Sequence, residues 1–286
     1  MKIDFHVHTN ASDGLLSPAS VFSRAKSLGL DGLAITDHDT VAALQEASNV
    51  AKSLDMFFIP GFELSCEEYN SAVHILAYGV DASNKELNEY FEKYREGKKN
   101  RLYGILSKLE KLDIFLTVEN LNMESLDNVS RVHIARAMLE KGYVKSIEEA
   151  FNRYLAEGKP AYVDYKKPTA TEGIEFIRSI NAIPVLAHPG LIKLSKEKLS
   201  KAIFDWKKAG LAGIEAFHPA HSLSENEMFN IIAKTNNMLV SAGSDFHDFP
   251  NTSAKHADLG KMLPLWVHSK QDTDTLMQFI AWEALA

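Results

Sequence analysis

The sequence predicts an α/β fold in which strands alternate with helices around a parallel sheet. Short apolar runs and helical stretches alternate towards both ends of the chain, and this order implies right-handed crossovers between parallel strands. Histidines and acidic residues follow several of the apolar runs, as they do at the carboxyl-terminal face of a barrel. The length of 286 residues and the hydrophobic content of 45% are sufficient for one barrel-sized core.

Local signals predict the first elements of this fold. Ile3, Phe5 and Val7 alternate with polar residues, which predicts a strand with a period of two. Ser17-Pro18 predicts the start of a helix, because serine caps a helix and proline suits its first position, and Gly29 ends it. Three further apolar runs predict strands at 33–36, 56–59 and 72–78.

The pattern becomes helical and highly charged after about residue 82. An apolar stripe that includes Leu87, Leu102 and Leu109 predicts a helix up to residue 112, and two more helical stretches follow at 132–142 and 146–156. Strand–helix alternation returns only near Thr169. We therefore predict a helical insertion at residues 82–165, between the two parts of a barrel at residues 1–81 and 166–286.

The last third of the chain repeats a helix–strand unit three times. The predicted pairs are 171–180 with 183–187, a helix ending at 209 with 213–217, and 225–235 with 238–242. A closing helix is predicted at 273–285.

Composition excludes several classes of protein. The formal net charge of −7 argues against a broad basic surface for duplex DNA, although a local phosphate pocket is compatible with it. The single cysteine, Cys66, rules out an internal disulfide and a thiolate zinc finger, and it is expected to be a buried apolar residue. No basic leader and no apolar run of about 18 residues is present. We expect a cytoplasmic enzyme without a membrane partner.

The candidate functional residues lie at or just beyond the ends of the apolar strands. His6 and His8 lie on one side of the first strand, and four more follow other strands, namely His38, His188, Asp245 and His247. Imidazole and carboxylate without thiolate suit zinc, manganese or iron. Adding Asp13, Glu63 and His74 gives nine candidates, which are too many for one ion and indicate two or three. For these three residues a structural role, such as a turn at Asp13, is an equal alternative.

The order of these residues resembles the motifs of the polymerase and histidinol phosphatase (PHP) family of phosphoesterases. The matching segments are His6-Val7-His8-Thr9, Ser12-Asp13-Gly14, Thr36-Asp37-His38-Asp39, Gly61-Phe62-Glu63, His74-Ile75-Leu76, His188-Pro189 and Ser244-Asp245-Phe246-His247. The resemblance implies a distorted (β/α)7 barrel with three ions. It assigns His6, His8, Glu63 and Asp245 to the first ion, Glu63, His74 and His188 to the second, and Asp13, His38 and His247 to the third.

The helical insertion resembles that of the PHP group that cleaves 3′,5′-nucleoside bisphosphates, some members of which trim RNA 5′ ends. Segments 98–103, 131–136 and 158–162 carry this likeness, although Ser130-Arg131-Val132-His133 stands where the group usually has Gly-Arg-Pro-His. The candidate substrate-binding residues are Asn100, Arg101, Arg131, His133 and Arg136. Arginine suits phosphate because its planar fork donates two hydrogen bonds, but Arg101 and Arg136 could equally lie on solvated helix faces.

The resemblance predicts a metal-dependent phosphoesterase that removes the 3′-phosphate of a 3′,5′-nucleoside bisphosphate, with a hydroxide between the ions as nucleophile. Three divalent ions are expected, with manganese first and zinc, iron or magnesium as alternatives. His221 is the candidate for protonating the leaving oxygen. The expected partner is a small phosphorylated nucleotide or the 5′ end of a short single-stranded RNA, and the oligomeric state stays open. The alternatives are a histidinol phosphate phosphatase and a catalytically silent PHP regulatory module.

Overall fold

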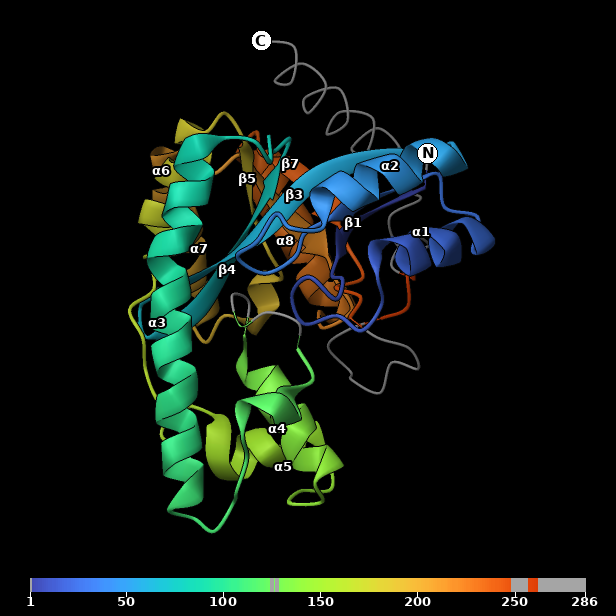
Figure 1. Cartoon of the computed structure of the whole chain (residues 1–286). Helices are drawn as coiled ribbons and strands as arrows, with labels where there is room; N and C mark the ends of the chain where they lie inside the picture. The colour runs from blue at the N-terminus through green and yellow to red at the C-terminus, as the bar shows by residue number, and fades with distance from the viewer. Residues whose placement is uncertain (1, 124–125, 127–128, 248–256, 262–286) are drawn as a thin grey trace. The chain divides into compact units, whose positions relative to one another are not determined.

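The computed structural model of the chain describes residues 2–123, 126, 129–247 and 257–261 (Figure 1). The chain divides into two compact units, the first formed by residues 1–88 and 167–286 and the second by residues 89–166. The closing helix predicted at 273–285 lies outside the described residues.

The first unit is built on a seven-stranded sheet whose strands follow one another in chain order. A parallel bridge between Val7 and Phe246 brings the two edges together, so the sheet is a nearly closed barrel, as predicted. The strands are β1 (Ile3–Val7), β2 (Gly32–Ile35), β3 (Phe57–Glu68), β4 (Ser71–Tyr78), β5 (Ile183–Leu186), β6 (Gly213–Phe217) and β7 (Leu239–Ala242).

One part of the sheet differs from the predicted parallel arrangement. β3 is longer than the predicted strand at 56–59, and β4 runs antiparallel to both β3 and β5. Tyr69 and Asn70 connect β3 to β4 with φ angles of 56° and 55°. Two residues with positive φ form a hairpin turn whose twist matches that of the strands. The turn has no glycine, which is why the sequence pattern did not reveal the hairpin.

Helices alternate with the remaining strands and cover the sheet (Figure 1). They are α1 (Pro18–Ser27), α2 (Leu44–Leu54), α6 (Ala170–Ser179), α7 (Lys196–Ala209) and α8 (Leu223–Thr235), with a short 3-10 turn, η3 (Pro189–Leu191). The Ser17 hydroxyl caps α1 by accepting a hydrogen bond from the Ser20 N–H, and the helix ends before Gly29, as the sequence predicted.

The core of the first unit lies between the sheet and these helices. All five residues of β1 are buried, because helices cover one face of the strand and the barrel interior covers the other. The Tyr78 hydroxyl donates to the backbone oxygen of Phe5 at 2.8 Å, which satisfies a phenol that is fully buried. Cys66 is buried, as predicted, and burial raises the pKa of its thiol well above the ordinary value.

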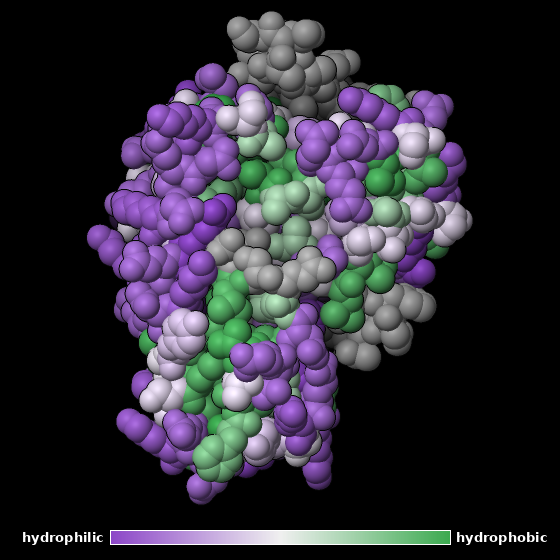
Figure 2. Space-filling view, viewed as in Figure 1, coloured by the Kyte–Doolittle hydropathy of each residue, from purple (hydrophilic) through white to green (hydrophobic). Residues whose placement is uncertain are grey.

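The second unit is helical and has its own apolar core. Its elements are α3 (Lys85–Glu110), η1 (Val118–Leu121), α4 (Arg131–Glu140), α5 (Ile147–Ala150) and a π-helical turn, η2 (Phe151–Leu155). Leu102, Leu109, Met138 and Leu155 are among the buried residues of the core. Hydrophilic residues dominate the visible surface of α3, in agreement with its charged sequence (Figure 2).

The boundary between the units lies inside α3. The second unit begins at Glu89 and not at residue 82, and it ends at Lys166. The first turn of α3 belongs to the barrel, since the Ser179 hydroxyl donates to Glu86 Oε1 at 3.1 Å and Leu87 is fully buried.

None of the helices in the described part of the chain combines the length and the apolar character that crossing a bilayer requires.

Candidate metal centre

All nine predicted ligands lie in the first unit, on elements that meet at one region of the barrel. His6 belongs to β1, Glu63 to β3 and His74 to β4. The other six follow a strand: His8 and Asp13 come after β1, His38 after β2, His188 after β5, and Asp245 and His247 after β7. β6 supplies none of the predicted ligands.

Four ligand atoms form a compact buried group. His6 Nε2 lies 3.0 Å from His8 Nε2, 3.1 Å from Glu63 Oε2 and 3.3 Å from Asp245 Oδ1. His8 Nε2 lies 3.2 Å from both of these carboxylate oxygens. Four ligands at about 2.0–2.1 Å from a tetrahedral ion are separated by roughly 3.3–3.4 Å. The group therefore has the dimensions of an ion site, with the four residues that the resemblance assigned to the first ion.

Glu63 connects this group to a second one. Its Oε1 lies 2.9 Å from His74 Nδ1 and 2.9 Å from His188 Nε2, while its Oε2 belongs to the first group. His38 Nδ1 lies 3.2 Å from Glu63 Oε2, so His38 also joins Glu63 and His74 in a possible ligand set. Glu63 therefore lies between the two groups, with one oxygen facing each.

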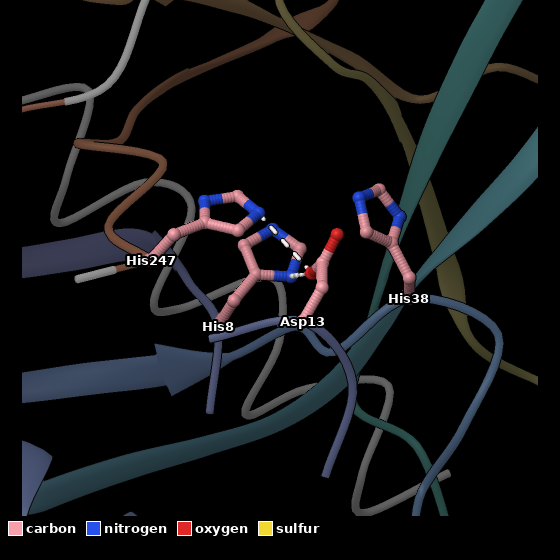
Figure 3. A group of neighbouring side chains, drawn as sticks. All are labelled: His8, Asp13, His38 and His247. Carbon is pink, nitrogen blue, oxygen red and sulfur yellow. Dashed lines mark ion pairs between the residues drawn. The ribbon is translucent and has the colours of Figure 1, made fainter. Parts of the chain in front are cut away.

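A third group consists of His8, Asp13, His38 and His247, and Figure 3 shows the Asp13 carboxylate between His38 and the other two histidines. His247 Nε2 lies 3.2 Å from Asp13 Oδ1, and His8 Nδ1 lies 3.9 Å from the same oxygen (Figure 3). The rings of His8 and His247 stack with their centroids 4.2 Å apart. His8 thus presents one ring nitrogen to each of two groups, which the resemblance did not imply.

The donor atoms fit divalent cations. The two Nε2 atoms of His6 and His8 face each other at 3.0 Å and also face carboxylate oxygens, an arrangement that a shared cation explains. Among the described residues, the buried Nδ1 atoms of His8 and His38 have no hydrogen-bond partner. Six imidazoles and three carboxylates without thiolate are ligands that zinc, manganese and iron accept.

The electrostatics of these groups are strongly coupled. Burial would raise the pKa of Glu63, but the imidazoles of His38, His6 and His74 outweigh burial and hold the pKa well below its ordinary value. Burial would lower the pKa of His8, but the carboxylates of Asp245 and Glu63 outweigh it and raise the pKa to about 10. Without a cation, imidazolium groups therefore balance the buried carboxylates.

Two further aspartates hold the loops that carry the ligands. Asp37 accepts hydrogen bonds from the Thr9 N–H at 2.7 Å and the Ser12 hydroxyl at 2.6 Å, which fixes the loop of Asp13. Asp4 accepts from the Ser244 N–H at 3.0 Å, which fixes the turn before Asp245. These hydrogen bonds hold Asp13 and Asp245 in position through contacts within the protein.

Sequence reasoning missed Asp4 and Glu215, which, like His218, are buried beside the ligands. His218 Nδ1 accepts from the Ala220 N–H at 3.1 Å, and its Nε2 lies 3.4 Å from Asp245 Oδ2. A signal was available for Asp4 and Glu215, because each is an acidic residue inside an apolar, buried strand, where an unpaired charge is costly.

The hydrogen bonds of His221 do not fit its predicted role, which was to protonate the leaving oxygen. Its Nδ1 donates to the Ala216 oxygen and to Asn226 Oδ1, both at 3.2 Å, and its Nε2 accepts from the Gly190 N–H at 3.0 Å. Burial, assisted by the charge of His218, lowers the pKa of His221 to about 4. The neutral ring holds the loop after His188, and both of its nitrogens are engaged in doing so.

The predicted substrate residues all belong to the second unit, where Arg101 and Arg131 form a pair. Their guanidinium carbons lie 5.5 Å and 5.6 Å from the ring centre of Tyr162. Arg101 Nε donates to the Val163 oxygen at 2.7 Å, and Arg131 Nη1 donates to the Leu155 oxygen at 3.0 Å. Burial and the neighbouring charge of Arg101 lower the pKa of Arg131, as expected for two cations held close together.

The other three predicted substrate residues have different surroundings. His133 Nδ1 accepts from the Ser130 N–H at 3.0 Å, so this ring helps to cap α4. Arg136 is half-buried on α4, and Asn100 is exposed on α3. Their contact with substrate stays a prediction.

Comparisons with known proteins agree on one family. The PHP domain model matches residues 4–208. The 3′,5′-nucleoside bisphosphate phosphatase of Chromobacterium violaceum is 33% identical over 249 residues, 86% of this chain and 87% of the relative. The 5′-3′ exoribonuclease of Haemophilus influenzae is 32% identical over 269 residues, which are 93% of this chain and 98% of the relative. A solved structure from Bifidobacterium adolescentis, described as a metal-dependent phosphoesterase, has a TM-score of 0.82 and 27% identity over 91% of each chain.

Proposed function

The chain belongs to the PHP family, and from this premise we propose that it removes the 3′-phosphate of a 3′,5′-nucleoside bisphosphate. It is a metal-dependent phosphoesterase, with histidines and carboxylates clustered so that they can bind metal ions. The proposed substrate is supported by the relative from Chromobacterium violaceum, whose name gives that activity and whose alignment spans 86% of this chain.

We propose that the centre holds three divalent ions, with manganese as the first candidate and zinc, iron or magnesium as the others. The proposed ligands are His6, His8, Glu63 and Asp245 for the first ion, Glu63, His74 and His188 for the second, and Asp13, His38 and His247 for the third. Bound cations would lower the pKa of water and neutralise charge on the phosphoryl group. The protein contributes by holding Glu63 between two groups and by fixing the loops of Asp13 and Asp245 through Asp37 and Asp4.

The arginine pair is the observation that favours a substrate with a second phosphate. Among the described residues, neither Arg101 nor Arg131 forms an ion pair with a carboxylate. Two half-buried guanidinium groups without an anionic partner attract a phosphate, because each can donate two parallel hydrogen bonds to phosphate oxygens.

Two observations argue against the alternatives, namely the arginine pair and the residue types at the ligand positions. Histidinol phosphate carries a cationic amine, which two neighbouring guanidinium groups would repel rather than bind. A silent regulatory module finds no support, since each of the nine ligand positions carries histidine, aspartate or glutamate.

The proposal is tested with Arg131→Ala and a panel of substrates. The panel is adenosine 3′,5′-bisphosphate, histidinol phosphate, an aryl phosphate and a 5′-phosphorylated oligoribonucleotide. We expect Arg131→Ala to lower kcat/KM for the bisphosphate by about 10- to 100-fold, the worth of a charged hydrogen bond, and to change the aryl phosphate little.

Arg153→Ala is a matched control within the same unit. Arg153 also lies over a tyrosine ring, that of Tyr154, but it is paired with Glu149 at 2.6 Å. This variant should leave the ratio of kcat/KM for the bisphosphate to kcat/KM for the aryl phosphate unchanged. An equal loss on bisphosphate and aryl phosphate in Arg131→Ala, or a wild-type preference for histidinol phosphate, would reject the proposed substrate.

Trimming of RNA 5′ ends is a second candidate function. It is supported by the relative from Haemophilus influenzae, which is named an exoribonuclease and aligns over nearly its whole length. Sizing the products of a short 5′-phosphorylated RNA tests this function. Stepwise release of mononucleotides is expected, and an intact RNA after complete turnover of the bisphosphate would exclude it.

A further inference from the structure

β6 contributes none of the nine proposed ligands, yet its single acidic residue is fully buried beside two of them. Glu215 is 0% exposed, in the middle of the apolar strand Gly213–Phe217. A carboxylate that is buried to this extent requires partners that donate hydrogen bonds to it. The hydrogen-bond partners of Glu215 indicate its role.

The first partner is the imidazole of His6. Glu215 Oε1 lies 3.0 Å from His6 Nδ1, while His6 Nε2 faces the first group of ligand atoms. A carboxylate can only accept, so His6 Nδ1 carries the hydrogen and donates it. The ring is then held in the tautomer that leaves the Nε2 lone pair available to a cation.

The second partner is the backbone of His188. Glu215 Oε2 accepts from the His188 N–H at 2.8 Å, and His188 Nε2 lies 2.9 Å from Glu63 Oε1. His188 has φ 26° and ψ 58°, a conformation with positive φ that is costly for a residue with a side chain. The hydrogen bond to Glu215 holds the backbone in this conformation and directs the ring towards Glu63.

The surrounding packing leaves Glu215 little freedom. A Cβ atom added to Gly243 would lie 2.5 Å from Glu215 Oε1 and 2.2 Å from the Cβ of His6. Gly243, which directly follows β7, is therefore in close contact with both Glu215 and His6. A shift of Glu215 would disturb the turn that leads to Asp245.

We propose that Glu215 is a positioning residue of the metal centre, which sets the tautomer of His6 and the backbone of His188 with its two oxygens. The inference rests on the metal-binding function proposed above. Glutamate is required because both partners are donors. Glutamine has one acceptor and one donor, so it could accept from either the His6 Nδ1–H or the His188 N–H but not from both.

The test is Glu215→Gln, which keeps the size of the side chain. Mn²⁺ and Zn²⁺ are titrated into metal-free protein in competition with a chelator. Removing the carboxylate partner of a ligating histidine typically weakens metal binding 10- to 100-fold, and we expect a loss of about this size for the tightest site. The increase in Tm on adding metal should fall accordingly, while the Tm of the metal-free protein changes far less.

Glu68→Gln is the matched control. Glu68 Oε2 also accepts two hydrogen bonds in the barrel, from Trp206 Nε1 at 2.9 Å and from the Thr171 N–H at 3.3 Å, but neither partner is a ligand. This variant should bind metal as the wild type does. Wild-type affinity in Glu215→Gln, or an equal loss of affinity in Glu68→Gln, would overturn the proposal.

A second variant serves if Glu215→Gln does not fold. Glu215→Asp keeps both acceptors and the charge but shortens the side chain by one methylene, so it also should weaken metal binding relative to the wild type. Unchanged affinity in Glu215→Asp would overturn the proposal. Because the readout is metal binding, the result is independent of which phosphate ester the wild type hydrolyses.

Discussion

Glu63 and His8 each present both of their polar atoms to the metal centre. Glu63 Oε2 lies with His6 and His8, and its Oε1 lies with His74 and His188. His8 likewise presents Nε2 to Asp245 and Nδ1 to Asp13. The ligand groups are therefore linked through shared side chains, so removal of one residue is expected to disturb more than one ion.

Single ligand substitutions should remove activity without unfolding the barrel. Asp245→Asn keeps the shape of the side chain but loses the charge that faces His6 and His8 at 3.3 Å and 3.2 Å. We expect a loss in kcat of roughly 100-fold or more, together with less bound metal. Kinetics, metal analysis and circular dichroism on Asp245→Asn and His6→Ala check this. Asp81→Asn, which changes an exposed aspartate, is the control, and full activity with normal metal content in the ligand variants would contradict the assignment.

Metal binding should depend on pH because a proton occupies His8 in the metal-free protein. The pKa of His8 is raised to about 10, since Asp245 and Glu63 outweigh the opposing effect of burial. The unfolded pKa is about 6.5, so the proton stabilises the metal-free fold below that pH, and this contribution is lost as pH rises through about 10. A cation has to displace the proton, and metal affinity should therefore rise between about pH 6 and pH 9.

Calorimetric titration in buffers with different ionisation enthalpies measures the protons released on metal binding. A release of at least one proton is expected near neutral pH, because the pKa of His6 is raised as well as that of His8. Heats that are the same in every buffer would show that no proton leaves, against this prediction.

At the scale of elements, the β3–β4 hairpin brings two ligands to the same face. His74 pairs with Ser65 across the two strands, and Glu63 lies two residues before Ser65 on β3. Residues two apart point to one face of a strand, and a cross-strand partner shares that face. This register places His74 Nδ1 2.9 Å from Glu63 Oε1.

Ser130 and His133 cap the start of α4. The Ser130 hydroxyl accepts from the Val132 N–H, and the Ser130 N–H donates to His133. Ser130→Ala should destabilise the start of α4 by about 1 kcal/mol, whereas Ser130→Gly should cost only a few tenths. Amide hydrogen exchange in α4 measures this difference, with faster exchange expected in Ser130→Ala. Equal exchange in both variants would indicate that the hydroxyl does not act as a cap.

At the scale of the whole molecule, metal should stabilise the first unit much more than the second. The proposed ligands come from β1, β3 and β4 and from the segments after β1, β2, β5 and β7, so bound ions would connect most of the barrel. The second unit has its own apolar core, which includes Leu102 and Met138. Removing ions present at 100 to 1,000 times their Kd costs about 3–4 kcal/mol, or on the order of 10 °C in Tm.

Calorimetry with and without a chelator tests this difference, with manganese added back as the control. Hydrogen exchange in α4 and in the part of α3 after Glu89 should be unchanged by the chelator. An equal loss of protection in both units would contradict the independence of the second core.

The sequence by itself determined the alternation of strands and helices, the helical character of the insertion and the residue types of the metal centre. These features depend on local spacing: Ser17-Pro18 starts α1, and imidazoles and carboxylates at strand ends indicate metal ligands wherever the strands lie. The resemblance of the ordered motifs to the PHP family supplied the grouping of those ligands.

Only the tertiary structure decided the direction of β4, the place of the unit boundary inside α3, and the roles of Glu215 and His221. Each of these depends on contacts between residues far apart in the chain. Glu215 is 209 positions from His6, and His221 is 31 positions from Gly190. Residue type and periodicity report which face of an element is buried, but the partner of a buried polar group is fixed only when the elements pack together.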